Sequence, residues 1–180
     1  MTEDLQINNV NGRPIQNGLA IIVMGVSGSG KTTLGALMAR AINAEFHDAD
    51  DYHDAPSVEK MRAGVPLTDD DRSPWLARLN ALLQSHVRDG KSVVLACSAL
   101  KQSYRAAILR DIANVRLVFL DGDYETIAAR IRERSAVTNH YMPESLLVSQ
   151  FETLERPFDA ITIDIALPSS AQLGCAMASI

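Results

Sequence analysis

A glycine-rich stretch near the start of the chain, residues 25–33 (GVSGSGKTT), contains the residue types of a phosphate-binding loop. The fixed positions of the pattern G-x-x-x-x-G-K-[ST] are all filled, by Gly25, Gly30, Lys31 and Thr32. In such a loop, glycines let N–H groups turn toward phosphate oxygens, the lysine contacts the β- and γ-phosphates, and the hydroxyl binds Mg²⁺. The spacing therefore predicts a nucleotide site rather than a chance turn. The predicted cofactor-binding residues are Gly25, Val26, Ser27, Gly28, Ser29, Gly30, Lys31, Thr32 and Thr33.

Two acids, Asp48 and Asp50, lie two residues apart at the end of a possible strand. On an extended backbone their side chains would project on the same side. One could bind the metal ion while the other accepts a proton from an alcohol, although a solvated acidic turn explains these residues equally well. Asp121, after an apolar run, is a second candidate for binding Mg²⁺.

Two pairs of cations lie where an anionic substrate could bind. Arg130 and Arg134 are four residues apart on a predicted helix and could stabilise charge on a transferring phosphate. A solvated helix face paired with Glu133 is the more common explanation of this spacing. Lys101 and Arg105 have the same spacing behind another predicted strand, and they could hold an anionic acceptor.

The histidines show no metal-ligand spacing with the two cysteines, so no metal site is expected among them. They are His47, His53, His86 and His140. His53 alone is a candidate site residue, because it follows the acidic segment DADDY. Cys97 lies in an apolar run and is expected to be a buried free thiol.

The elements that must position these residues alternate along the chain. Apolar runs predict strands at 19–24, 92–97, 115–120 and 160–165, with a weaker candidate at 45–50. Helical periodicity or end signals predict helices from Gly30 or Lys31 and at 57–63, 103–110 and 124–134, and one starting with Ser73 as N-cap and Pro74 in the first turn.

Five strands alternating with helices predict an α/β fold with a five-stranded, mostly parallel sheet flanked by helices. Ligands are then expected at the carboxyl ends of the strands. Residues 1–18 should form a flexible extension before a single domain at 19–180. The polar segment SAVTNH, residues 135–140, predicts a mobile lid around 134–142.

Composition excludes several classes of protein. The 180 residues carry 17 Lys and Arg against 22 Asp and Glu, a net charge of −5, so no general basic surface for nucleic acid is expected. No apolar run approaches the roughly 18 residues of a membrane span. The two cysteines form no disulfide framework, which fits a cytoplasmic protein.

Taken in order, five segments resemble the gluconokinase family, which is related in fold to shikimate and nucleoside monophosphate kinases. They are GVSGSGKTT, DADDYH, KMRAGVPLTDDDRSPWL, CSALKQSYR and HYMPESLLVSQFETLE. The resemblance covers about residues 20–165 and implies a P-loop NTPase fold, a homodimer, and transfer of the γ-phosphate of ATP to the 6-hydroxyl of D-gluconate with Mg²⁺. It places Asp50 at the acceptor hydroxyl and Asp48 near the metal.

Within the resembling segments, five polar residues could reach the carboxylate and hydroxyls of a sugar acid. They are His53, Lys60, Arg72, Lys101 and Arg105. Arg72 could instead be structural and pair with Asp69, Asp70 and Asp71. The five residues between Arg134 and His140 form a longer link than the family pattern, which leaves open which lid arginine contacts phosphate.

Two other functions fit parts of the sequence. A kinase of another small acceptor, such as shikimate, adenylylsulfate or a nucleoside monophosphate, would share the loop and the fold. A nucleotide-dependent switch would also share the loop, but a guanine switch normally carries an N-K-x-D motif, which the chain lacks.

Overall fold

The computed structural model describes residues 18–137 and 144–180, and it contains one five-stranded sheet with strand order β2-β3-β1-β4-β5. All four neighbouring pairs are parallel, so the α/β prediction is confirmed. In chain order the elements are β1 (Ala20–Met24), α1 (Lys31–Ala41), β2 (Glu45–Asp48), the 3-10 turn η1 (Ala49–Tyr52), α2 (Ala55–Arg62), α3 (Asp69–Arg88), β3 (Val93–Ala96), α4 (Gln102–Leu109), β4 (Val115–Asp121), α5 (Tyr124–Val137), α6 (Glu144–Thr153), β5 (Ile161–Asp164) and α7 (Ser169–Ala178).

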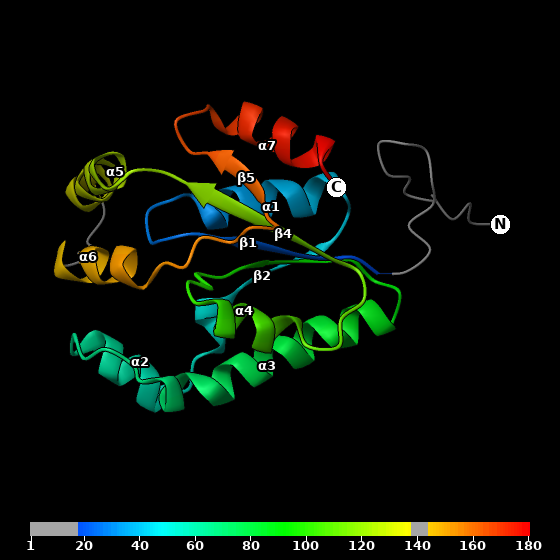
Figure 1. Ribbon diagram of the computed structural model, residues 1–180, viewed down its shortest axis with the longest axis horizontal. Coiled ribbons are helices and arrows are strands. Elements are labelled where there is room, and N and C mark those ends of the chain that lie inside the picture. Colours follow the sequence, from blue (N-terminus) through cyan, green and yellow to red (C-terminus); the bar gives the residue numbers. More distant parts are fainter. Residues whose placement is uncertain (1–17, 138–143) are drawn as a thin grey trace.

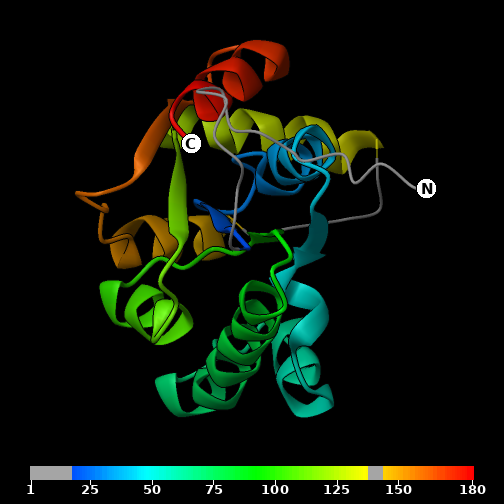
Figure 2. The ribbon, with the colours of Figure 1, turned by 90° about the vertical axis from the view of Figure 1, so that its right-hand side faces the viewer.

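Helices cover both faces of the sheet. Figures 1 and 2 show α1 and α7 above it and α3 and α4 below it. The central strand β1 is fully buried and contributes to both cores: Ile21 and Val23 pack on the side of α1, while Ile22 and Met24 pack on the side of α3. A strand buried on both faces needs a continuous apolar run, which is how β1 reads in the sequence.

The start of α3 differs from the prediction. Thr68, not Ser73, is the N-cap, because Thr68 Oγ1 accepts from the Asp71 N–H at 3.2 Å and Asp71 Oδ2 accepts from the Thr68 N–H at 2.9 Å. This reciprocal pair starts the helix five residues earlier. Pro74 lies inside the helix, where its missing N–H leaves the Asp70 carbonyl without its usual partner.

Two further boundaries are corrected. The strand expected at 45–50 ends at Asp48, where the chain turns into η1. Helix α5 continues to Val137, so the first part of the segment expected to form a lid is helical. The rest of that segment, and the expected extension apart from Gly18, lie outside the described residues.

Cys97, just after β3, is buried as expected, and burial raises the pKa of its thiol to about 12. The thiol is therefore protonated and unreactive at neutral pH. Within residues 18–137 and 144–180, no helix is both long and apolar enough to cross a bilayer.

Candidate active site

The phosphate-binding loop connects β1 to α1, and its shape favours glycine, as Gly28 and Gly30 show. Gly28 has a φ of +82°, and a Cβ there would lie 2.7 Å from Ile131 Cγ1 of α5. Gly30, the N-cap of α1, has a φ of +101°. Since L side chains rarely adopt such φ values, both positions favour glycine, and α5 packs directly against the loop.

The loop lysine lies against the loop itself. Lys31 Nζ donates to the Val26 carbonyl at 3.0 Å, which holds the ammonium across the loop. At the first turn of α1 this charge adds to the partial positive charge of the helix N-terminus. The arrangement suits an anionic nucleotide tail.

Two oxygen ligands for a metal ion lie side by side. Thr32 Oγ1 donates to Asp48 Oδ2 at 2.9 Å. Neighbouring ligands of octahedral Mg²⁺ are about 2.9 Å apart, given Mg–O distances of about 2.0–2.1 Å, so these residues fit that ion. The rival acid Asp121 instead forms an ion pair with Arg156 at 2.6 Å.

Asp50 lies in η1 rather than on an extended strand, so its relation to Asp48 differs from the predicted one. The Asp50 N–H donates to Asp48 Oδ1 at 3.2 Å, which caps η1 and orients both acids. Part of the Asp50 side chain is exposed to solvent. The protein around it nevertheless displaces water, and this burial raises the pKa of the carboxyl; the Asp48 carboxylate raises it further. Lys31 and His53 oppose the shift. A raised pKa suits a general base.

His53 stacks on Trp75, with ring centroids 4.5 Å apart and planes 9° from parallel. Trp75 is fixed in turn, because its Nε1 donates to the Ala49 carbonyl at 2.8 Å. Burial lowers the pKa of the His53 imidazole; Asp50 opposes this and Arg72 adds to it. His53 Nδ1 is buried without a hydrogen-bond partner among the described residues, so a ligand hydroxyl could satisfy it.

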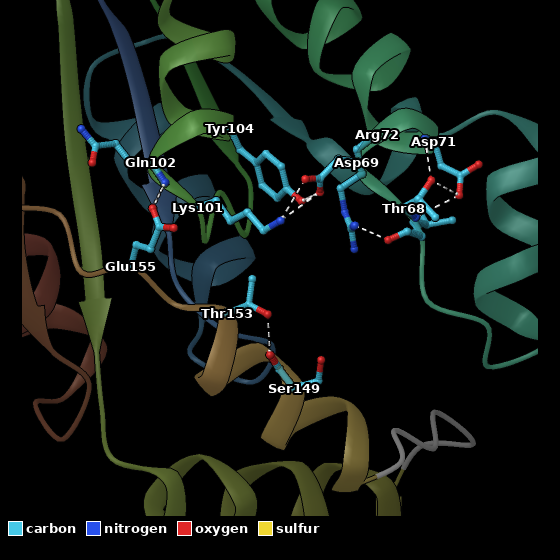
Figure 3. A network of polar contacts seen from close by, with 11 residues as sticks. Thr68, Asp69, Asp71, Arg72, Lys101, Gln102, Tyr104, Ser149, Thr153 and Glu155 are labelled. Atoms are coloured by element: carbon cyan, nitrogen blue, oxygen red, sulfur yellow. Dashed lines mark hydrogen bonds and ion pairs between the residues drawn. The ribbon is translucent and has the colours of Figure 1, made fainter.

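The predicted substrate lysines, Lys60 of α2 and Lys101 at the N-cap of α4, each pair with an acid in the first turn of α3. Figure 3 shows the pair formed by Lys101. Lys101 Nζ is 3.0 Å from Asp69, which also accepts from the Tyr104 hydroxyl. Lys60 Nζ is 2.7 Å from Asp71, and this hydrogen bond, together with those from Thr68, lowers the pKa of the Asp71 carboxyl to about 2. Both lysines are therefore oriented by α3 before any substrate binds.

Arg72 does not form the ion pairs with Asp69 and Asp71 that its alternative, structural role predicted. Its Nη1 donates to the Leu67 carbonyl, and its guanidinium lies 5.7 Å from the centre of the Tyr104 ring. The aspartates of the same turn pair with lysines instead, so the suggested pairing of Arg72 with them is wrong for Asp69 and Asp71.

Arg105, a predicted substrate residue, is only 7% exposed. Its Nη1 donates to the carbonyls of Ala99 and Leu100, both at 3.0 Å. In the structure the guanidinium therefore supports the β3–α4 connection, where Ala99 has a φ of +43°.

We expect Arg105→Ala to lower the free energy of unfolding by about 2–3 kcal/mol, because it removes the donor to the Ala99 carbonyl and one of the two donors to the Leu100 carbonyl. Urea denaturation measures this loss. Arg110→Ala, at an exposed position just after α4, is the matched control and should change stability by less than about 0.5 kcal/mol. Equal stabilities of the two variants would contradict the structural role.

The two lid arginines lie on α5. Arg130 donates through Nη2 to the Ile165 carbonyl, just after β5, and it is half-buried. Arg134 lies on the last turns of α5 by its backbone, and its side chain is outside the described part of the chain. Their predicted contacts with phosphate remain predictions.

One residue that the sequence analysis missed fixes the loop from α6. Gln150 Oε1 accepts from the Ser27 N–H at 2.7 Å, and Gln150 Nε2 donates to Ser27 Oγ at 3.0 Å. The residue lies in the segment SQFETLE, but nothing in its local pattern points to a loop 123 residues away. Figure 1 shows α5 and α6 together beyond the head of the β4 arrow.

We expect Gln150→Ala to raise KM for the nucleotide about 5- to 20-fold with a smaller change in kcat, because two hydrogen bonds that shape the loop are lost. Steady-state kinetics at saturating acceptor measure this. Glu152→Ala, an exposed change on the same helix, should leave KM unchanged. An unaltered KM in Gln150→Ala would show that the loop holds its shape without α6.

Several known proteins resemble this chain in sequence and in fold. A family described as "AAA domain" matches residues 21–157. The thermosensitive gluconokinase of Escherichia coli K12 is 46% identical over 152 residues, covering 82% of this chain and 80% of that protein. A gluconokinase of Arabidopsis thaliana is 42% identical, covering 77% and 78%. The crystal structure of a gluconokinase from Sinorhizobium meliloti 1021 superposes with a TM-score of 0.79 at 39% identity, covering 92% of each chain. The identities and the coverage together show that this chain belongs to the gluconokinase family.

Proposed function

We propose that the protein transfers the γ-phosphate of ATP to the 6-hydroxyl of D-gluconate, giving 6-phosphogluconate. The observation that carries this proposal is the position of Asp50 beside the Thr32–Asp48 pair, which puts a candidate base next to the nucleotide end of the site. Membership of the gluconokinase family supports gluconate as the acceptor. Mg²⁺, a homodimer and a cytoplasmic location belong to the same proposal.

Each step of the proposed mechanism is assigned to residues of this chain. The loop N–H groups and Lys31 bind the triphosphate, while Thr32 and Asp48 would hold Mg²⁺. When bound, ATP and its metal supply the phosphoryl group and neutralise part of its charge. Asp50 orients the acceptor hydroxyl and accepts its proton, so that the reacting oxygens are aligned rather than merely close.

The acceptor is proposed to lie between η1 and the start of α3. His53, stacked on Trp75, would form a hydrogen bond with a sugar hydroxyl through Nδ1, either accepting from the hydroxyl or donating to it. Lys60, Lys101 and Arg72 would attract the carboxylate, although each lysine already has an acid beside it. Because those acids offset the positive charge, this end of the site should prefer a polyhydroxy monoanion to a more highly charged acceptor.

The test is a coupled assay with a panel of acceptors: gluconate, shikimate, adenylylsulfate and nucleoside monophosphates. We expect ATP-dependent turnover with gluconate alone. Turnover with another compound and none with gluconate would overturn the acceptor assignment while leaving the kinase fold intact. Nucleotide hydrolysis without any phosphorylated acceptor would instead favour a switch.

A further inference from the structure

Two of the four histidines meet a glutamate away from the proposed kinase site. Glu45 and His47 lie on β2, and His86 lies in the last turn of α3. Glu45 Oε2 is 3.0 Å from His86 Nε2 and 3.6 Å from His47 Nε2, and the three ligand atoms all lie within 4.8 Å of one another. The spacing of histidines and cysteines along the chain gave no sign of this cluster, because its residues come together only in the folded chain.

These distances suit a tetrahedral metal ion. With metal–ligand bonds of about 2.0–2.2 Å, the ligand atoms of tetrahedral Zn²⁺ lie roughly 3.3–3.6 Å apart. The two distances from Glu45 are close to that range, and the two histidine nitrogens lie within 4.8 Å of each other, so a bound ion would have to draw the ligands together. Imidazole nitrogens together with one carboxylate are ligands that Zn²⁺ accepts readily, whereas Mg²⁺ prefers oxygen.

The far nitrogen of each imidazole already has a partner, as in known zinc sites. His86 Nδ1 lies 2.9 Å from the Leu82 carbonyl, and since a carbonyl can only accept, Nδ1 must carry the proton. His47 Nδ1 lies 2.7 Å from the Tyr52 hydroxyl. These contacts direct both Nε2 atoms toward Glu45.

His47 adds an independent sign of a missing ligand. Its Nε2 is buried and has no hydrogen-bond partner among the described residues, which is uncommon for a polar atom in a folded protein. Glu45 Oε2, at 3.6 Å, lies beyond hydrogen-bond distance, so this nitrogen is available to a metal ion.

The cluster is separate from the proposed Mg²⁺ site although both use β2. Side chains alternate along a strand. Asp48 faces α1, where it meets Thr32, and Phe46 packs there against Gly35. Glu45 and His47 therefore lie on the opposite face, toward α3.

We propose that Glu45, His47 and His86 form a Zn²⁺ site that clips the edge strand β2 to the end of α3, with a fourth position left for water. The ion would cross-link β2, the strand that carries Asp48 and leads to Asp50, to α3. Its role is structural, and it does not depend on which acceptor the enzyme uses.

Calorimetric titration of the full chain with Zn²⁺, in excess Mg²⁺, tests the proposal. A Cys175→Ser background removes the exposed thiol as a competing ligand. We expect one Zn²⁺ per chain and a rise in Tm, with affinity lowered about tenfold or more in Glu45→Gln and in His86→Asn. Because Glu45 is 57% exposed, its replacement should leave the fold intact.

Two matched variants separate this site from others. Glu59→Gln, exposed on α2, and Asp48→Asn, on the other face of β2, should bind Zn²⁺ like the parent protein. Bound Co²⁺ should show the visible absorption of a tetrahedral ion, lost in Glu45→Gln. Absence of Zn²⁺ binding, equal affinity in the parent and Glu45→Gln, or loss of binding in Asp48→Asn would each overturn the proposal.

Discussion

Replacing Lys31 with Ala is expected to lower kcat/KM for ATP-dependent phosphorylation of gluconate about 10²- to 10³-fold. The ammonium, held across the loop by the Val26 carbonyl, is placed where negative charge on the transferring phosphate must be neutralised. Removing one preorganised donor of this kind typically has an effect of that size. A coupled assay under saturating and limiting ATP measures it.

The control for this prediction is Lys91→Ala, which removes an exposed lysine just before β3, at the opposite end of the sheet. It should keep full activity, and both variants should show the circular dichroism of the parent protein. A Lys31→Ala enzyme within threefold of the parent would mean that the loop amides alone supply the stabilisation.

Replacing Asp50 with Asn is expected to lower kcat about 10²- to 10⁴-fold, because the amide cannot accept the proton of the acceptor hydroxyl. The KM for ATP should change little, since Asp50 lies beside the Thr32–Asp48 pair rather than in the loop. Asp51→Asn, one residue further along and exposed, is the matched control. Full turnover in Asp50→Asn would remove this residue as the base.

The same substitution should raise Tm at neutral pH. The folded protein raises the pKa of Asp50, chiefly by burial, so it holds the proton more tightly than the unfolded chain. The stability linked to this group is therefore fully present below the unfolded pKa and is lost as pH rises through the folded pKa. At neutral pH the ionised carboxylate destabilises the fold, and a neutral amide removes that penalty. A lower Tm in Asp50→Asn at neutral pH, with no gain in the parent protein on acidification, would contradict this.

The central part of the site could be predicted because it is local. The β1 run, the glycine loop and the start of α1 are consecutive in the chain, and each requires its own residue types. The start of α3 was predicted wrongly for a related reason: Ser73 and Pro74 are common start signals, but Thr68 and Asp71 form the actual capping box. Two competing local signals were present, and reciprocal hydrogen bonding decided between them.

Contacts between distant segments could not be predicted from residue spacing. The buried position of Arg105, the hydrogen bonds of Gln150 to Ser27, and the approach of His86 to Glu45 all depend on how helices pack on the sheet. Asp50 shows the same limit at short range, since the turn into η1 changed its direction relative to Asp48. Residue types at these positions indicated chemistry, but packing determined their partners.

The two parts of the proposed active site are attached to strands that have different numbers of neighbouring strands. The nucleotide loop follows β1, which is paired on both sides. Asp48 ends β2 and Asp50 follows it, and within the described part of the chain β2 is an edge strand paired with β3 alone. Local unfolding begins where elements have fewest neighbours. Mild denaturant should therefore abolish phosphate transfer before it abolishes nucleotide binding, and amide hydrogens of β2 should exchange with solvent sooner than those of β1.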